Sequence, residues 1–273
     1  MTDVERLVAD ELATSVDPRV NAMAAAIAAK HPGTLAVLFY GSCLRDATLS
    51  GMLDFYVIVE DYARAYPARW LATANRLLPP NVFPFAMDNL SAKYAVLSRA
   101  DLQRETGVAA RDPSTFARLA QPLRLVWGDQ TAVLAPVAEA ARTLLSVTPK
   151  TADDPWRSAF AATYASELRA ERAARPGSIV DADPARYTAL SAVLGEVPDR
   201  AAEWPRLRRW SKARQLAKLA KASLTFAGGI DYLAWKIARH SGQPVDVTPW
   251  QRKHPLLAAF TMLPRLIARG QIR

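Results

Sequence analysis

Two short apolar runs lie close together near the start of the chain, TLAVLFYGS at 34–42 and MLDFYVIVED at 52–61. Both are rich in β-branched and aromatic residues, and a short polar connection separates them, which is typical of neighbouring strands. A third run of this kind, KYAVLS at 93–98, follows the proline-rich stretch PPNVFPF at 79–85, for which we predict an extended loop. The three runs predict a small mixed sheet.

Helical patterns surround these runs. Apolar residues recur at helical spacing within 1–30, on both sides of a proline, and further helices are expected at 70–78, 99–106 and 130–146. The segment 124–129 adds a turn or an edge strand. Strands that alternate with helices in this way predict an α+β fold with a small mixed sheet.

Beyond residue 148 the sequence is predicted to be mostly helical, with a helix start where two aspartates, Asp153 and Asp154, precede a proline. We therefore divide the chain into a mixed-sheet domain (1–148), a helical domain (149–203) and a basic, amphipathic C-terminal region (204–273).

Charge is distributed unevenly along the chain. Residues 204–273 hold fourteen Lys or Arg and two acids, whereas residues 1–203 carry a small net negative charge. This asymmetry is expected in a protein with a polyanionic partner, either a nucleic acid or an anionic membrane surface. A solvated basic helix face is the commoner explanation of a charge run and stays open.

Several classes of protein are not expected. A single cysteine, Cys43, and three scattered histidines provide neither a disulfide nor a structural zinc cluster. The longest apolar stretch of the C-terminal half, residues 256–264, is about half of the roughly 20 residues that a membrane-spanning helix needs. The N-terminal residues carry acids where an export signal carries bases. We expect a cytoplasmic protein.

The most informative constellation is Tyr40-Gly41-Ser42 followed, after eleven residues, by Asp54 on the next apolar run. A strand that ends in Gly-Ser places backbone N–H groups and a hydroxyl opposite a carboxylate, which suits a nucleoside triphosphate bound with Mg²⁺. This pattern resembles the nucleotidyltransferase superfamily with the polymerase-β-like fold, although Tyr56 stands where a second acid is usual. An inactive member of that superfamily and a chance Gly-Ser before a strand are the alternatives.

Four further segments resemble, in the same order, segments of one family, the mitochondrial-type (translocator assembly and maintenance) phosphatidate cytidylyltransferases. They are KYAVLS at 93–98, FARLAQPLRLV at 116–126, YASELR at 164–169 and the basic C-terminal stretch. The resemblance covers roughly residues 35–240, and that family also carries a single acid on this strand. The sequence departs from the family at Cys43 and Ser166, and it lacks a histidine-containing stretch near 66–80.

The resemblance implies an enzyme that uses CTP, phosphatidic acid and Mg²⁺ to form CDP-diacylglycerol. Asp54 is the expected metal ligand and catalytic carboxylate, because a carboxylate in an apolar strand needs a metal or a paired base. Glu167 is the candidate for a second catalytic carboxylate, followed by Asp88 and then by Glu60 and Asp61. The residues expected to bind nucleotide or phosphate are Tyr40, Gly41, Ser42, Lys93, Arg118 and Arg169.

The basic C-terminal region and its tryptophans are expected to bind an anionic membrane surface peripherally, at the inner face of the cell membrane, and no nucleic acid is expected. Two other functions stay open: a nucleotidyltransferase with a soluble acceptor, and a non-catalytic protein that binds nucleic acid through the same basic helix. The residues do not define the oligomeric state.

Overall fold

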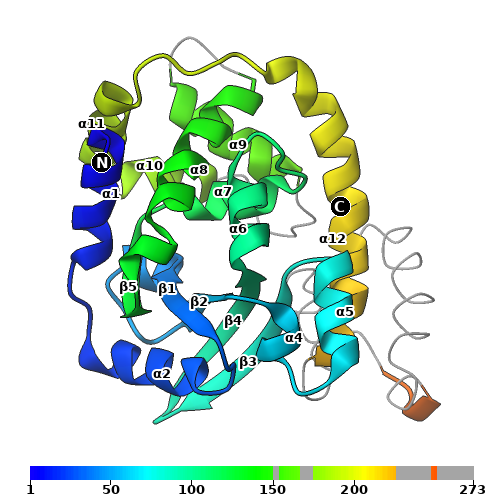
Figure 1. The fold of residues 1–273 in the computed structure, drawn as a ribbon. Helices are drawn as coiled ribbons and strands as arrows, with labels where there is room; N and C mark the ends of the chain where they lie inside the picture. The colour runs from blue at the N-terminus through cyan, green and yellow to red at the C-terminus, as the bar shows by residue number, and fades with distance from the viewer. Residues whose placement is uncertain (150–153, 167–174, 226–246, 251–273) are drawn as a thin grey trace.

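The computed structural model describes residues 1–149, 154–166, 175–225 and 247–250 (Figure 1). A five-stranded sheet with the order β3-β4-β2-β1-β5 lies at its centre. Its strands are β1 (Thr34–Tyr40), β2 (Met52–Val59), β3 (Asn81–Met87), β4 (Leu90–Ser98) and β5 (Leu123–Gly128). Strands β2 and β4 are parallel and the other neighbouring pairs are antiparallel. The mixed sheet and the surrounding helices confirm an α+β fold.

The prediction of an extended loop at 79–85 was wrong, because β3 begins at Asn81 and pairs with β4 through Met87. Proline is compatible with a strand at the edge of a sheet, where one side of the backbone has no partner strand. Strand β3 occupies such an edge, so Pro84 fits within it. The strand at the opposite edge, β5, confirms the edge strand expected at 124–129.

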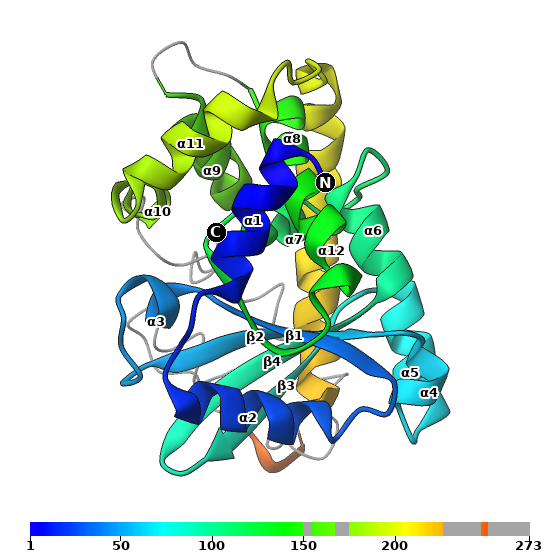
Figure 2. The ribbon, with the colours of Figure 1, turned by 60° about the vertical axis from the view of Figure 1, so that its left-hand side comes forward.

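Two layers of helices cover the sheet (Figures 1 and 2). The first layer, α2 (Pro18–Ala28), α4 (Tyr62–Ala65) and α5 (Arg69–Leu77), packs on the face that carries Phe39 and Phe55. The second layer packs on the face that carries Tyr40 and Tyr56. Its helices are α1 (Asp3–Ala13), α6 (Arg99–Thr106), α7 (Pro113–Leu119), α8 (Leu134–Val147), α9 (Pro155–Ala165), α10 (Arg175–Asp181) and α11 (Pro184–Leu194).

Local sequence explains where several helices begin. Thr2 and Glu5 form a reciprocal capping box at the start of α1, and Asp17 caps α2 directly before a proline. Asp154 caps α9 in the same way, which confirms the helix start expected there. A proline at the first position suits a helix start, because the N–H that it lacks would have no partner in the helix.

One apolar core joins the sheet to the second helical layer, and it continues from Val4 through Trp156 and Tyr187 to Leu207. Helices α9 and α11 therefore share their core with the sheet. The division of the chain at residues 148 and 203 stays a prediction.

Helix α12 (Trp204–Thr225) runs along one side of the molecule (Figure 1). Trp204, Leu207 and Ser211 are buried on its inner side. Lys218 forms an ion pair with the buried Asp112, and the ammonium of Lys221 donates to two backbone carbonyls before β3. No helix in the described residues is both long and apolar enough to cross a membrane.

Candidate active site

Asp54 lies near the start of β2, between two neighbouring strands. The register places it opposite Tyr40 of β1 on one side and Lys93 of β4 on the other. Directly opposed residues of neighbouring strands share one face of a sheet, so the three side chains form a row on the face beneath the second helical layer. The carboxylate and the ammonium of this row form an ion pair, with Asp54 Oδ1 3.1 Å from Lys93 Nζ.

Gly41 brings the end of β1 against this carboxylate. Its φ is +94°, a conformation that favours glycine, and a Cβ added there would lie 2.8 Å from Asp54 Oδ2. Ser42 follows and begins the short helix α3 (Ser42–Arg45), where it is half-buried. The structure therefore brings Gly41 and Asp54 together, as the spacing predicts, with Ser42 directly after Gly41, and the strand register adds Lys93.

The ion pair changes the argument for a metal at Asp54. The Asp54 side chain is 16% exposed and that of Lys93 is 40% exposed, so a partly buried carboxylate has a paired base without a metal. Asp54 can still serve as a Mg²⁺ ligand, since this ion commonly uses one or two carboxylates together with substrate phosphates and water. In the described part of the chain, no three His, Cys, Asp or Glu side chains gather as a metal-binding group.

The carboxylates ranked after Glu167 as a second catalytic acid do not all lie near Asp54. Glu60 and Asp61 follow the far end of β2, about 20 Å from Asp54 at the rise of an extended strand. Glu60 pairs with Arg99 and Asp61 with Arg76, so the structure does not bring these two carboxylates to Asp54. The other candidate, Asp88, is exposed in the turn between β3 and β4.

Glu167 and Arg169 lie outside the described residues, so their roles stay predictions. The end of α9, just before them, is described. Tyr164 of this helix accepts a hydrogen bond from the buried side-chain amide of Gln121, with the nitrogen and oxygen 3.3 Å apart. Gln121 lies two residues before Leu123, which pairs with Tyr40. Helix α9 therefore ends near the end of β1 at which the site lies.

Tyr56, at the position of the usual second acid, is a core residue. Its ring stacks on that of Tyr40, with centroids 5.0 Å apart, and both side chains are buried. A carboxylate at this position would be placed in an apolar core, where its charge would be costly. The absence of the second acid therefore fits the local packing, and it leaves Asp54 as the carboxylate of this strand near the site.

Two other residues from the sequence analysis have local roles. Burial raises the pKa of the Cys43 thiol, and the negative charge of Asp54 raises it further, which disfavours a nucleophilic thiolate. The guanidinium of Arg118, on α7, donates to the carbonyl of Ser114 at 2.8 Å. A phosphate contact of Arg118 stays a prediction.

Sequence reasoning missed Arg45, at the end of α3. Its Nη1 donates to the side-chain oxygen of Gln121, 3.2 Å away. The sequence contains a signal for this residue, because Arg45 follows Ser42 by three positions and residues at this spacing share one side of a helix. Gln121 gives no such signal, since its approach to Arg45 depends on the tertiary fold.

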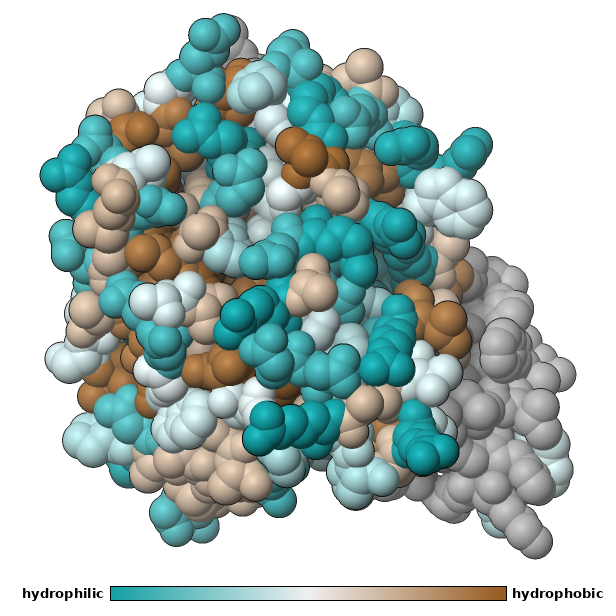
Figure 3. Space-filling model, viewed as in Figure 1, coloured by the Kyte–Doolittle hydropathy of each residue, from teal (hydrophilic) through white to brown (hydrophobic). Residues whose placement is uncertain are grey.

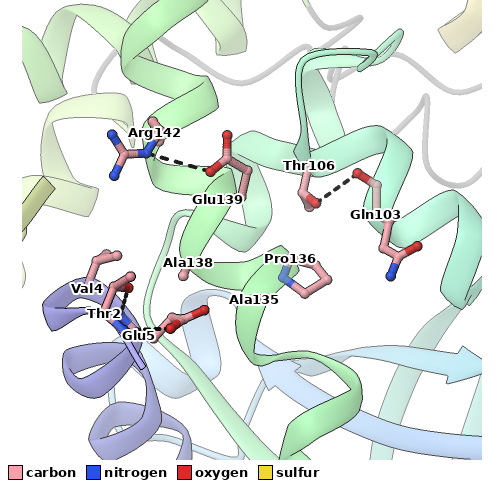
Figure 4. Close-up of a pocket in the computed structure, with 10 residues that line it drawn as sticks. All are labelled: Thr2, Val4, Glu5, Gln103, Thr106, Ala135, Pro136, Ala138, Glu139 and Arg142. Atoms are coloured by element: carbon pink, nitrogen blue, oxygen red, sulfur yellow. Dashed lines mark hydrogen bonds and ion pairs between the residues drawn. The ribbon is translucent and has the colours of Figure 1, made fainter. Parts of the chain in front are cut away.

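A separate surface pocket of about 370 Å³ lies between α1, α6 and α8 (Figure 4). Glu139 and Arg142 form an ion pair at 3.6 Å on its wall, and burial raises the pKa of Glu139. The Thr106 hydroxyl donates to backbone carbonyls of its own helix. This pocket has no lining residue in common with the Asp54 site.

No protein-family model matches the chain, and no curated protein matches it either. Functional assignment therefore depends on the local geometry around Asp54.

Proposed function

We propose that the chain is a phosphatidate cytidylyltransferase, which transfers CMP from CTP to phosphatidic acid and releases pyrophosphate. The observation that carries this proposal is the carboxylate of Asp54, held between the backbone of Gly41 and the ammonium of Lys93 at 3.1 Å. Such an arrangement offers a carboxylate, a close backbone and a cation at one end of the central strands of the sheet. These groups suit a nucleoside triphosphate and the cation that accompanies it.

Each residue of the arrangement has a task in this reaction. The hydroxyl of Ser42 and the N–H groups of the Gly41-Ser42 turn would donate to phosphate oxygens. Lys93 would neutralise charge on the triphosphate, and Asp54 would hold Mg²⁺ together with the phosphates. The bound ion would supply charge neutralisation and orientation.

The bonds of the proposed reaction balance without a further reactant. A phosphate oxygen of phosphatidic acid forms a bond to the α-phosphorus of CTP, while the bond from that phosphorus to the β-bridging oxygen breaks. Pyrophosphate leaves with the electron pair of that bond, and CDP-diacylglycerol is formed. Positioning of the two phosphates and stabilisation of their charge are the main contributions expected of the protein.

Helix α12 supports a lipid substrate. Figure 3 shows hydrophilic residues on the right-hand side of the molecule, along which α12 runs in Figure 1, and Trp210 of this helix is 55% exposed. Four bases of α12 near Trp210 are exposed as well, namely Arg206, Arg208, Arg209 and Lys212. None of the four forms an ion pair with a described residue, so their charge is available to anionic headgroups at the cytoplasmic face of a membrane. The remaining C-terminal residues of the predicted membrane-binding region lie almost entirely outside the described residues.

The test is an assay of the intact protein with CTP, Mg²⁺ and vesicles that contain phosphatidic acid. We expect CDP-diacylglycerol and pyrophosphate in equal amounts. Transfer to a soluble acceptor without vesicles would favour a nucleotidyltransferase of another substrate class. Salt-sensitive RNA or DNA binding without nucleotidyl transfer would favour the nucleic-acid-binding alternative and would overturn the proposal.

Membrane association is tested separately by vesicle sedimentation. Reversal of charge at Arg208 and Arg209 should weaken binding to vesicles with anionic lipid by roughly tenfold or more, since each base near such a surface contributes about 1 kcal/mol. Charge reversal at two exposed bases away from α12, Lys30 just after α2 and Arg64 of α4, is the matched control. Equal losses for the two pairs would contradict a specific role of α12.

A further inference from the structure

We propose that helix α5 is a second membrane-binding element, which lies on an anionic lipid surface together with α12. This inference rests on the proposed membrane association, and it does not depend on nucleotidyl transfer. Helix α5 exposes two large apolar side chains, Trp70 and Leu77, at 49% and 80%. Exposed apolar side chains are informative where they form a patch rather than occur singly, and these two belong to one short helix.

A buried asparagine fixes the rotation of α5 against the sheet. The amide nitrogen of Asn75 donates to the Tyr66 hydroxyl and to the Val96 carbonyl, each at 2.9 Å. Its side-chain oxygen accepts from the N–H of Asn81 at 2.6 Å. Rotation of the helix to bury its exposed apolar side chains would break these three hydrogen bonds and leave buried polar groups unpaired, which is costly. The apolar side chains of α5 are therefore held at the surface.

The exposed side of α5 carries an apolar row and a basic row. Trp70 and Leu77 are seven residues apart, and so are Arg69 and Arg76, and all four are exposed. At about 100° per residue, each pair forms one line along the helix, and the two lines are about 100° apart. A helix of this kind can lie flat on a membrane, with its apolar row below the headgroups and its arginines beside them.

The charge of this segment suits an anionic surface. Residues 62–80 hold three arginines and no acid. Arg69 forms no ion pair with a described residue, and Arg76 forms an exposed pair with Asp61 at 3.3 Å. Because an exposed pair contributes little to stability, both guanidinium groups are available to lipid phosphates.

Helix α5 contacts the basic helix α12 (Figure 1). The ammonium of Lys221 donates to the carbonyls of Leu78 and Pro80, which follow α5 directly. The exposed bases of α12 begin at Arg206, about 22 Å from Lys221 along the helix axis. Both contacting helices thus expose a tryptophan beside arginines, and α5 extends the basic surface proposed for α12.

A second copy of the chain fits this helix less well than a lipid surface does. A symmetric dimer interface places the same patch of both copies in contact. The arginine rows of two α5 helices would then approach each other, and residues 62–80 offer no acid to pair with them. Anionic headgroups carry the opposite charge and avoid this repulsion.

Sedimentation with vesicles of phosphatidylcholine and phosphatidylglycerol tests this inference, because neither lipid is the proposed substrate. Trp70→Ala combined with Leu77→Ala should weaken binding by roughly tenfold or more, since the variant buries less apolar area in the membrane. Trp127→Ala combined with Val108→Ala is the matched control, because these apolar residues are exposed on β5 and between α6 and α7. The control should change binding less than twofold, and equal losses in the two double variants would overturn the inference.

The basic row is tested in the same assay. Arg69→Gln combined with Arg76→Gln should weaken binding by roughly tenfold or more at low salt and by less at high salt. Arg64→Gln is the control, because the Arg64 side chain lies against Gly33 before β1, where an added Cβ would be 3.1 Å from its Cδ. Equal losses per base in the two variants would show an effect of net charge alone and would overturn the role of the basic row.

A fluorescent label tests membrane insertion directly. Cys43 is the only cysteine and is buried, so a thiol-reactive NBD label can be directed to an introduced cysteine at an exposed position. With Leu77→Cys, the emission should rise and shift to the blue when vesicles are added, whereas with Val108→Cys it should not change. Circular dichroism checks that both labelled variants are folded. Unchanged emission of the Leu77→Cys protein on vesicles that bind it would overturn the inference.

The outcomes separate this inference from the proposed function. Vesicle binding that depends on α5 in a protein that forms no CDP-diacylglycerol would support the inference and contradict the proposed function. Formation of CDP-diacylglycerol with vesicle binding unaffected by the α5 variants would overturn the inference alone. Loss of self-association in the variant of Trp70 and Leu77, with unchanged vesicle binding, would assign this face to a second copy and overturn the inference. Absence of vesicle binding by the unmodified protein would overturn it together with the proposed membrane association.

Discussion

Two ion pairs of this protein differ in their exposure and in the number of further hydrogen bonds that their side chains form. Glu11 of α1 and Arg186 of α11 form a buried pair, with 12% and 7% of their side chains exposed, whereas the pair of Asp54 and Lys93 at the sheet is more open. The Glu11 carboxylate also accepts from the Leu123 N–H at 2.7 Å. The guanidinium of Arg186 also donates to the backbone carbonyls of Ala120 and Gln121.

The open pair has fewer partners. The side chains of Asp54 and Lys93 share one contact, and neither side chain has another hydrogen bond with a described residue. A buried pair with saturated hydrogen bonds holds elements together, since its loss leaves an uncompensated charge. A partly exposed pair with free acceptors and donors contributes little to stability and can exchange its partner for a ligand. The pair of Glu11 and Arg186 is therefore a structural contact, whereas the pair of Asp54 and Lys93 belongs to the candidate site.

The largest effect is expected when the saturated pair is broken. Glu11→Ala leaves Arg186 buried without its carboxylate and should lower the free energy of unfolding by about 3–5 kcal/mol. Urea denaturation measures this loss. Lys93→Met in the open pair is the comparison, and equal losses in the two variants would remove the distinction.

The second effect concerns the glycine that contacts Asp54. Gly41→Ala introduces backbone strain at φ +94° and a Cβ 2.8 Å from the carboxylate, and it should destabilise the fold by about 1–3 kcal/mol. Nucleotide binding should fall as well, because Asp54 must move. Gly195→Ala is the matched control: φ there is also positive, at +62°, but no atom lies within 4 Å of the added Cβ. Loss of nucleotide binding in both variants would indicate a global effect.

A third cation, the ammonium of Lys221 on α12, extends the comparison because among the described residues it has carbonyl partners and no carboxylate. Burial lowers the pKa of Lys221 from its ordinary value of 10.5 to about 7. Between these values the unfolded chain binds more protons, so stability should rise with pH, by at most about 1.4 kcal/mol per unit. Below about pH 7 both states are protonated and this contribution is flat.

Thermal unfolding between pH 6 and pH 9 measures the contribution of Lys221. Lys221→Met should remove part of the rise with pH and should stabilise the fold most at the acidic end. The exposed Lys212 on the same helix provides the control Lys212→Met, which should retain the rise. A pH profile unaffected by Lys221→Met would show that this ammonium is not desolvated.

The smallest effect on stability is expected at the open pair. Lys93→Met should change the free energy of unfolding by less than about 1 kcal/mol, since the pair is partly exposed. Affinity for tripolyphosphate should nevertheless fall, because a cation near the proposed phosphate site is lost. A large loss of stability without a change in affinity would assign Lys93 a structural role.

Local patterns in the sequence were sufficient for much of the fold and for part of the site. The runs at 34–42 and 52–61 predicted adjacent strands. The spacing between Gly41 and Asp54 predicted that both residues lie at the same end of these two strands. The proline-rich strand β3 was missed, because proline argues against a strand unless its position at an edge is known.

Contacts between distant segments were not predictable in this way. The side chain of Gln121 meets Arg45 and Tyr164, and Arg186 meets Glu11 from the other end of the chain. Such contacts depend on how the helical layer is placed on the sheet, which periodicity and turn signals do not encode. The ion pair of Lys93 with Asp54 likewise depends on the register between two strands that are not consecutive.

The most direct test of the central claim compares Asp54, near the start of β2, with Glu60, the residue directly after the end of β2. Asp54→Asn and Glu60→Gln each neutralise an ion-paired acid, at opposite ends of β2. We predict that Asp54→Asn lowers CDP-diacylglycerol formation at least about a hundredfold, with stability changed by less than about 1 kcal/mol, and that Glu60→Gln retains activity. Equal activity of Asp54→Asn and the unmodified protein would contradict the claim that Asp54 is the centre of the site.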